Sequence, residues 1–271
     1  MKSDRAELQW KREKGSSIFG GAPMTHTGKE AGLLSRLKLL KGYSPGKRVL
    51  SIGCGTAAEL RLLREQGLSA VGLDPERSYL LEGKAKDNAE DLIQAIGENM
   101  PLRNNVFDLV LLFEVLEHVI NPEFVLKEIS RVLKPNSLVL LTVPNRFYLF
   151  ETHGVQICGR QINNLLGVGI PFLSMAPNFL RRGFERARVY SEADVLSLLR
   201  KFGFDPLAVE YIMPSLDARK QTPLTNAIKQ VILSSSKIPL VRRFGSNIAI
   251  ISRKKTVASD AHQELQAFQG P

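Results

Sequence analysis

The chain has 271 residues, of which 44% are hydrophobic and 24% are charged, ordinary proportions for a globular protein with a sizeable core. Its formal net charge is +10, and the excess of bases lies in residues 1–48 and 181–255, on either side of a mildly acidic centre. Such flanks can attract phosphates, an anionic substrate or an anionic membrane surface, or they can simply keep the protein in solution.

Cysteine usage and the apolar stretches exclude several classes of protein. Cys54 and Cys158 lie far apart and fit neither a disulfide framework nor a metal site. The first residues have no apolar core, so we expect no secretory leader. The longest apolar-rich stretch, residues 165–177, is too short and too broken by glycine and proline to span a bilayer. We therefore expect a cytoplasmic protein.

The middle of the chain alternates between strand and helix patterns. Residues 29–42 have apolar positions at helical spacing and precede this series. We expect strands at 48–52, 69–74, 92–97, 106–114 and 136–144, and helices at 57–67, 75–86 and 121–134. Such alternation predicts an α/β fold of the Rossmann-like, doubly wound type, with a mainly parallel sheet.

The alternation stops after residue 144. Residues 145–190 show no clear strand, and we expect them to form an inserted lid that selects the substrate, since a connection of this length is usually functional or disordered. A helix at 191–203, with a capping-box start, and strands at 205–213 and 246–254 follow. We expect one domain over 1–255, with 1–44 as a helical cover and 256–271 as a disordered tail.

Two glycines interrupt the stretch RVLSIGCGTAAEL at the end of the first strand. Ligands of open parallel sheets bind at the carboxyl ends of strands, and glycine there lets a ligand approach the backbone closely. Gly53 and Gly55 fit that role, although a tight turn would need them too. Cys54 lies between them, where it either borders the ligand or packs in the core.

Polar residues follow the next two strands at the same edge. Asp74 ends the second strand, where a carboxylate can accept hydrogen bonds from both hydroxyls of a ribose. Residues 97–102, GENMPL, offer polar groups beside an apolar side chain, which suits an adenine. A nucleoside pocket is therefore predicted, and because GCGTAA also satisfies the dinucleotide fingerprint, an NAD-dependent enzyme is one candidate.

The region after the third strand decides between the nucleoside cofactors that fit such a pocket. Residues 107–108 read FD, residues 114–118 read EVLEH, and residues 131–135 read RVLKP. With the glycine loop, these segments resemble the class I S-adenosylmethionine-dependent methyltransferases, in particular the small-molecule group related to the ubiquinone-biosynthesis enzymes. The resemblance is strong over 45–145 and covers 190–254 by pattern only.

The resemblance implies a seven-stranded sheet that ends in an antiparallel hairpin, and S-adenosyl-L-methionine as cofactor. The cofactor-binding residues that it implies are Gly53, Cys54, Gly55, Asp74, Pro75, Glu98, Asn99, Met100 and Glu114. Two positions depart from the family pattern, because Ser51 replaces the acid before the loop and Ala57 replaces its third glycine.

Two places offer a catalytic base for methyl transfer. His118 follows the fourth strand, where it could take up a proton or merely cap the next helix. Glu151 and His153 are spaced to face the same side of an extended segment, so one could orient the other or both could pin the insert to the core.

The insert and the basic stretches indicate the kind of acceptor that the protein would take. The apolar insert and the basic stretches RRGFERAR and KIPLVRRFG favour a small or amphiphilic acceptor, lipid-like or phosphorylated, and contact with an anionic membrane surface. No nucleic-acid-binding module is recognisable, and no metal is expected. The alternatives are a cofactor-binding module without catalysis and, less favoured, an NAD-dependent dehydrogenase. The oligomeric state is left open.

Overall fold

The protein is described from a computed structural model of the chain. The structure describes residues 32–33, 35–43, 45–86, 91–148, 150–151, 155–157, 160–162, 170–171, 174–175, 187–213, 230 and 238–256. Most of the expected cover at 1–44, most of the insert at 145–190 and nearly all of the tail at 256–271 lie outside these residues.

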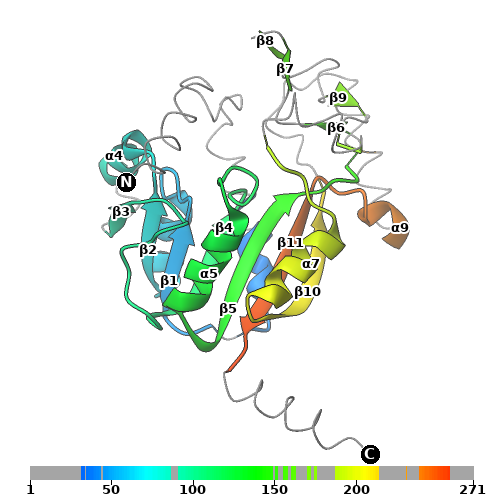
Figure 1. Cartoon of the computed structure of the whole chain (residues 1–271). Helices are drawn as coiled ribbons and strands as arrows, with labels where there is room; N and C mark the ends of the chain where they lie inside the picture. Colours follow the sequence, from blue (N-terminus) through cyan, green and yellow to red (C-terminus); the bar gives the residue numbers. More distant parts are fainter. Residues whose placement is uncertain are drawn as a thin grey trace, which may run out of the picture.

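A seven-stranded sheet forms the centre of the molecule (Figure 1), in the order β10-β11-β5-β4-β1-β2-β3. Its strands are β1 (Arg48–Ile52), β2 (Ser69–Asp74), β3 (Leu92–Gln94), β4 (Phe107–Phe113), β5 (Leu133–Pro144), β10 (Phe204–Ile212) and β11 (Asn247–Lys254). The strands from β3 to β5 pair in parallel, whereas β11 runs antiparallel to both of its neighbours. The doubly wound sheet with its C-terminal antiparallel hairpin is confirmed.

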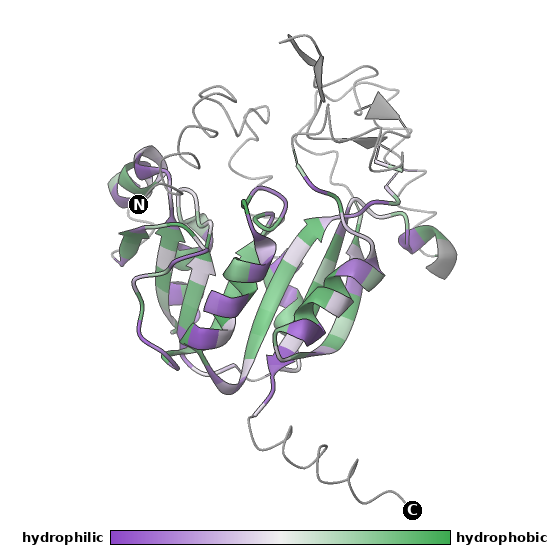
Figure 2. Cartoon of the chain, viewed as in Figure 1, coloured by the Kyte–Doolittle hydropathy of each residue, from purple (hydrophilic) through white to green (hydrophobic). Residues whose placement is uncertain are grey.

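Apolar residues cover both faces of this sheet. On one face α5 (Pro122–Val132) and α7 (Glu192–Lys201) pack against the strands, and on the other α3 (Ala58–Glu65) and α4 (Arg77–Ala85) do so. The short η1 (Lys38–Leu40) adds leucines to the second face. Because both faces are buried, the inner strands are hydrophobic along most of their length, as Figure 2 shows.

Side-chain caps fix where two of these helices begin. Asn121 accepts a hydrogen bond from the backbone N–H of Glu123, and Pro122 occupies the first helical position of α5. Ser191 and Asp194 form the expected capping box at the start of α7. These caps set the ends of the connections that precede the two helices, and both connections lie at the carboxyl edge of the sheet.

The sheet has one switch point that matters for function. From β1 the chain winds outward through β2 to β3, and then returns to the opposite side of β1 as β4. The connections that follow β1 and β4 therefore leave in opposite directions and open a crevice at the carboxyl ends of these strands. The glycine loop after β1 and residues 114–118 after β4 border that crevice.

The insert contains strands that the sequence analysis did not expect. β6 (Phe150–Glu151) pairs with β9 (Ile170–Pro171), and β7 (Val155–Ile157) pairs with β8 (Arg160–Ile162). Strands of two or three residues are too short to show an alternation of polar and apolar residues. Figure 1 draws them beyond the arrowhead of β5. Within the described part of the chain, no helix is both long and apolar enough to cross a bilayer.

Candidate active site

The glycine loop owes its shape to three residues with positive φ. Gly53, Gly55 and Ala57 have φ values of 68°, 53° and 57°. Gly53 and Cys54 donate their N–H groups to the carbonyl of Leu73, which holds the loop against β2. Ala57 is the N-cap of α3, and its left-handed backbone explains why a glycine would fit this position with less strain, by about 1–2 kcal/mol.

The two glycines serve different purposes. A Cβ on Gly53 would lie 2.4 Å from the Val115 side chain, so this glycine lets residues 114–118 pack against the loop. A Cβ on Gly55 would meet no atom of the described residues within 4 Å, so within that part of the chain Gly55 faces open space. Such a bare backbone beside the switch point is what a bound nucleoside cofactor requires. Cys54 is buried, which raises the pKa of its thiol and favours its packing role.

Asp74 is bound to the loop more tightly than its position at a strand end indicates. The residue is only 6% exposed, and its carboxylate accepts hydrogen bonds from the N–H groups of Gly55 and Glu76, each at 2.8 Å. Burial raises the pKa of Asp74, while these two bonds lower it. A carboxylate offers about four acceptor sites, so capacity for ribose hydroxyls remains.

The segment expected beside an adenine is fixed by its polar neighbours. Glu98 accepts a hydrogen bond from the N–H of Ile120 at 2.9 Å, which joins this segment to the connection after β4. Met100 is buried in the core, and its N–H bonds to Glu128. Asn99 and Pro75 are exposed at this edge. Exposed groups are therefore available for the base, whereas Met100 contributes mainly to packing.

Glu114 is the centre of a polar network at the end of β4. Its backbone has a positive φ of 56°, which is strained for a residue other than glycine. Its carboxylate accepts hydrogen bonds from Thr142 on β5 at 2.6 Å and Asn247 on β11 at 2.5 Å. The guanidinium of Arg36 lies 3.6 Å from the same carboxylate. Three strands and the N-terminal segment thus meet at this group.

Glu117 and His118 stand next to this network. Glu117 is 2% exposed, and neither oxygen of its carboxyl group accepts a hydrogen bond from the residues that the structure describes. Burial, and secondarily the neighbouring Glu114, raises the pKa of Glu117 well above its ordinary value. The imidazole Nε2 of His118 lies 3.8 Å from Oε1 of Glu117, and the His118 side chain is 17% exposed. A buried carboxyl behind a partly exposed imidazole suits proton transfer.

Sequence reasoning missed several residues of this edge. Arg36, Arg188 and Asn247 reach it from distant parts of the chain, and Glu59 reaches it from the first turn of α3. Of these residues, only Glu59 could have been predicted from the sequence, because it follows the glycine loop within the first turn of a helix. Of the predicted catalytic pair in the insert, His153 lies outside the described residues, and the side chain of Glu151 is not among those that the structure describes.

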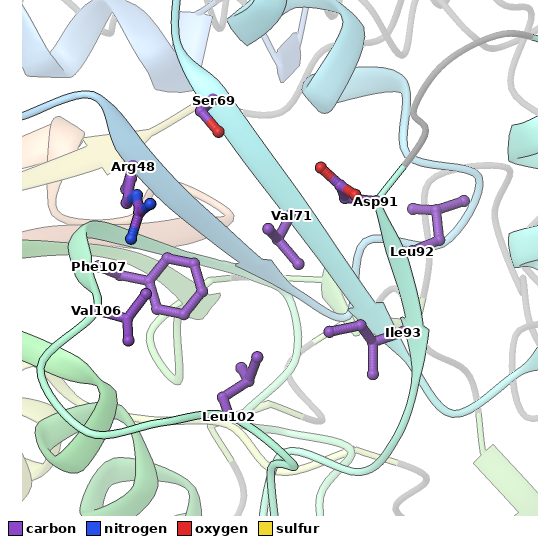
Figure 3. A pocket seen from close by; sticks show the side chains of 9 residues that line it. All are labelled: Arg48, Ser69, Val71, Asp91, Leu92, Ile93, Leu102, Val106 and Phe107. Atoms are coloured by element: carbon purple, nitrogen blue, oxygen red, sulfur yellow. The ribbon is translucent and has the colours of Figure 1, made fainter.

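A hollow of the described surface lies elsewhere (Figure 3). Its volume is about 440 Å³, and it is lined at the amino ends of the strands by Arg48, Ser69 and Phe107, with apolar side chains such as Val71 and Ile93. Ligands of such sheets bind at the opposite edge. We therefore place the site at the glycine loop.

Fold and site together define a class of protein. A seven-stranded sheet with an antiparallel seventh strand, and a glycine loop at its switch point, is the arrangement that the resemblance to class I methyltransferases implied. The family of methyltransferase domains matches residues 28–209, which is more than half of the chain. The chain therefore belongs to this family, and the resemblance is confirmed.

Individual relatives agree with this assignment. The chain is 34% identical over 122 residues to a ubiquinone biosynthesis O-methyltransferase of Pseudomonas aeruginosa (strain LESB58), which covers 41% of this chain and 51% of that protein. It is 35% identical over 106 residues to cycloartenol-C-24-methyltransferase 1 of Oryza sativa subsp. japonica, covering 36% of this chain and 31% of that protein. The matched part thus spans about half or less of these curated relatives.

Solved structures share the fold. An S-adenosylmethionine-dependent methyltransferase of Mesorhizobium loti superposes with a TM-score of 0.55 and 16% identity, covering 88% of this chain and 100% of that one. At this identity the likeness bears on the fold alone.

Proposed function

We propose that the protein transfers a methyl group from S-adenosylmethionine to a hydroxyl group of a small or amphiphilic acceptor. The observation that carries the proposal is the bare backbone at Gly55, which faces open space at the switch point of the sheet. Asp74, bonded to that same residue, is the group for the ribose hydroxyls. The family assignment and the relative named as an O-methyltransferase support the reaction type.

The residues of the site have two roles, to hold the acceptor in line with the donor and to take up its proton. S-adenosylmethionine would supply an activated methyl group on a sulfonium, so the protein must chiefly align the acceptor with it, which can contribute roughly 7–11 kcal/mol. His118 takes the proton of the acceptor hydroxyl, and the Glu117 carboxyl group lies behind the imidazole, 3.8 Å from its Nε2. His153 and Glu151 remain a second candidate pair for this role.

Exposed apolar groups support an amphiphilic acceptor and contact with an anionic membrane surface at the cytoplasmic side. Phe147 follows the turn after β5, and Phe244 follows the short α9 (Pro239–Arg242); both side chains are exposed. Asn145 joins the two segments, because its side-chain amide donates to the carbonyls of Arg243 and Gly245. The exposed Arg243 adds positive charge beside these rings, whereas the charge of Arg242 is paired with Glu210 at 2.7 Å.

Two ligands distinguish this function from its alternatives. In titration calorimetry, S-adenosylhomocysteine should bind the purified protein, and NAD should not. Tight binding of NAD alone would support a dehydrogenase instead and reject the proposal.

A variant then separates a methyltransferase from a cofactor-binding module. His118→Asn should leave the affinity for S-adenosylhomocysteine unchanged and lower the turnover of a hydroxylated quinol precursor by about 10²- to 10⁴-fold. Full activity of this variant would remove His118 from the mechanism. Binding of the cofactor without transfer to any of a panel of phenolic, lipid and phosphorylated acceptors would favour the non-catalytic module.

A further inference from the structure

A carboxyl group lies buried next to the glycine loop without an evident task in the fold. Glu59 is in the first turn of α3 and is 6% exposed. Its Oε1 accepts a hydrogen bond of 2.7 Å from the hydroxyl of Ser51, which is itself buried at the end of β1. Burying an ionisable group costs free energy unless partners compensate for it, so an apolar residue would serve packing better.

Two charged groups face Glu59, from opposite sides of the loop in sequence. Arg36, in the N-terminal segment, attracts its carboxylate, whereas Asp74 at the end of β2 repels it. The carboxylate in turn raises the pKa of the Cys54 thiol in the loop. Arg36 is shared, because its guanidinium also pairs with Glu114 and lies over the ring of Phe113. Glu59 is thus a partly compensated acid at the edge of the predicted donor site.

We propose that Glu59 is a positioning residue for the methyl donor, whose carboxylate, oriented by Ser51, attracts the α-ammonium group of the aminoacyl end of that donor toward the glycine loop. The proposal rests on the function proposed above. It also assigns a role to Ser51, the position at which the family pattern has an acid: the serine hydroxyl orients a carboxylate that reaches the loop from α3 instead of from β1.

The protonation of Glu59 makes the proposal sensitive to pH. Burial raises the pKa of Glu59 to about 7, against the lowering effects of the hydrogen bonds from the Ser51 hydroxyl and from its own backbone N–H, and of Arg36. An α-ammonium group beside it favours the ionised carboxylate, so binding of the ligand lowers this pKa and releases a proton. Donor affinity should therefore rise with pH through the neutral range.

Titration calorimetry with S-adenosylhomocysteine at pH 6 and pH 8 measures this effect. The wild type should bind about fivefold more tightly at pH 8 than at pH 6, the change expected if the ligand lowers a pKa of about 7 by about one unit. Glu59→Gln retains an acceptor for the Ser51 hydroxyl but not the charge, so its affinity should not change between the two pH values. Ser51→Ala should move the midpoint of the pH dependence upward, because the lost hydrogen bond favoured the ionised form.

A second ligand shows which part of the donor depends on Glu59. 5′-Methylthioadenosine lacks the amino and carboxylate groups of the aminoacyl end, so Glu59→Gln should bind it as the wild type does. An equal loss for both ligands would mean that Glu59 only supports the loop, and it would overturn the proposal.

Relocating the charge provides the rescue test. Ser51→Asp combined with Glu59→Gln restores one carboxylate at the same place from the strand side, and should recover affinity for S-adenosylhomocysteine at pH 8. Affinity no better than that of Glu59→Gln would count against the proposal. Melting temperatures identify variants that lose affinity by unfolding. If the wild type itself bound no S-adenosylhomocysteine, the proposed function would fail first; normal binding by Glu59→Gln would refute only the role of Glu59.

Discussion

Gly53 and Gly55 have the same backbone conformation but different surroundings, and this difference predicts different effects of one methyl group. Gly53→Ala should lower both the free energy of unfolding and the cofactor affinity, because its Cβ would collide with Val115. Val115→Ala in the same chain should restore part of the stability. Gly55→Ala should cost only the strain of a positive φ, about 1–2 kcal/mol, while it removes space for the cofactor.

Urea unfolding and calorimetry with S-adenosylhomocysteine check these glycine variants. A Gly55→Ala protein that keeps the wild-type affinity would show that the cofactor does not pass over this residue.

The raised pKa of the buried Glu117 carboxyl group predicts how the free energy of unfolding depends on pH. Since its pKa is raised in the folded state, the unfolded chain ionises first as pH rises above the ordinary value of 4.5, and the folded protein loses stability until its own pKa is reached. Glu117→Gln removes this loss, so the variant should have a larger free energy of unfolding than the wild type at pH 8. At pH 5 this difference should be much smaller. Urea unfolding at both pH values measures this. An equal difference at the two pH values would contradict it.

At the scale of elements, the segment that precedes α7 holds the connection after β4. The two terminal guanidinium nitrogens of Arg188 donate to the carbonyls of Val119 and Ile120, and its backbone N–H donates to the carbonyl of Glu117. The hydroxyl of Tyr190 donates to the carbonyl of Leu116 at 3.0 Å. This clamp joins the end of the insert to the turn that carries His118.

Arg188→Met should therefore loosen that turn without unfolding the sheet. We expect faster hydrogen exchange at residues 116–120 and unchanged exchange in β1 and β4, together with lower turnover. Arg61→Met is the matched control, because Arg61 pairs with Glu65 on the exposed surface of α3. If both variants exchanged alike at 116–120, the clamp would have no special role.

Periodicity predicted the elements of the fold because it depends on near neighbours in the chain. The strands of the sheet and the helices α3, α4, α5 and α7 were all expected, as was the capping box of Ser191. The site was predicted where residues directly follow strands, as with Gly55, Asp74 and His118. Asn247 contacts Glu114 across 133 positions of sequence, and Arg188 reaches Ile120 across 68. No local pattern marks such partners, since the sheet alone brings them together.

At the scale of the whole molecule, the uneven distribution of charge along the chain predicts which part of the protein contacts an anionic membrane. The bases concentrate at the two flanks of the chain, and in the described part Arg242 and Arg243 lie beside exposed Ile238 and Phe244. Basic and apolar side chains together suit an anionic bilayer, where each base near the surface contributes about 1 kcal/mol. The protein should therefore sediment with vesicles of phosphatidylglycerol and not with vesicles of phosphatidylcholine, and added salt should release it.

Substitution at this corner tests the interpretation. Phe244→Ser combined with Ile238→Ser should weaken sedimentation with the anionic vesicles, because burial of each apolar side chain contributes about 1.5–3 kcal/mol. Phe124→Ser on α5 is the matched control, since Phe124 is also exposed but lies away from the clustered bases. Affinity for S-adenosylhomocysteine should be unchanged in all of these proteins, as none of the three side chains contacts the glycine loop. Equal vesicle binding by the double variant and the wild type would show that this corner does not face a membrane, and the basic flanks would then have to act on a soluble anion or on solubility alone.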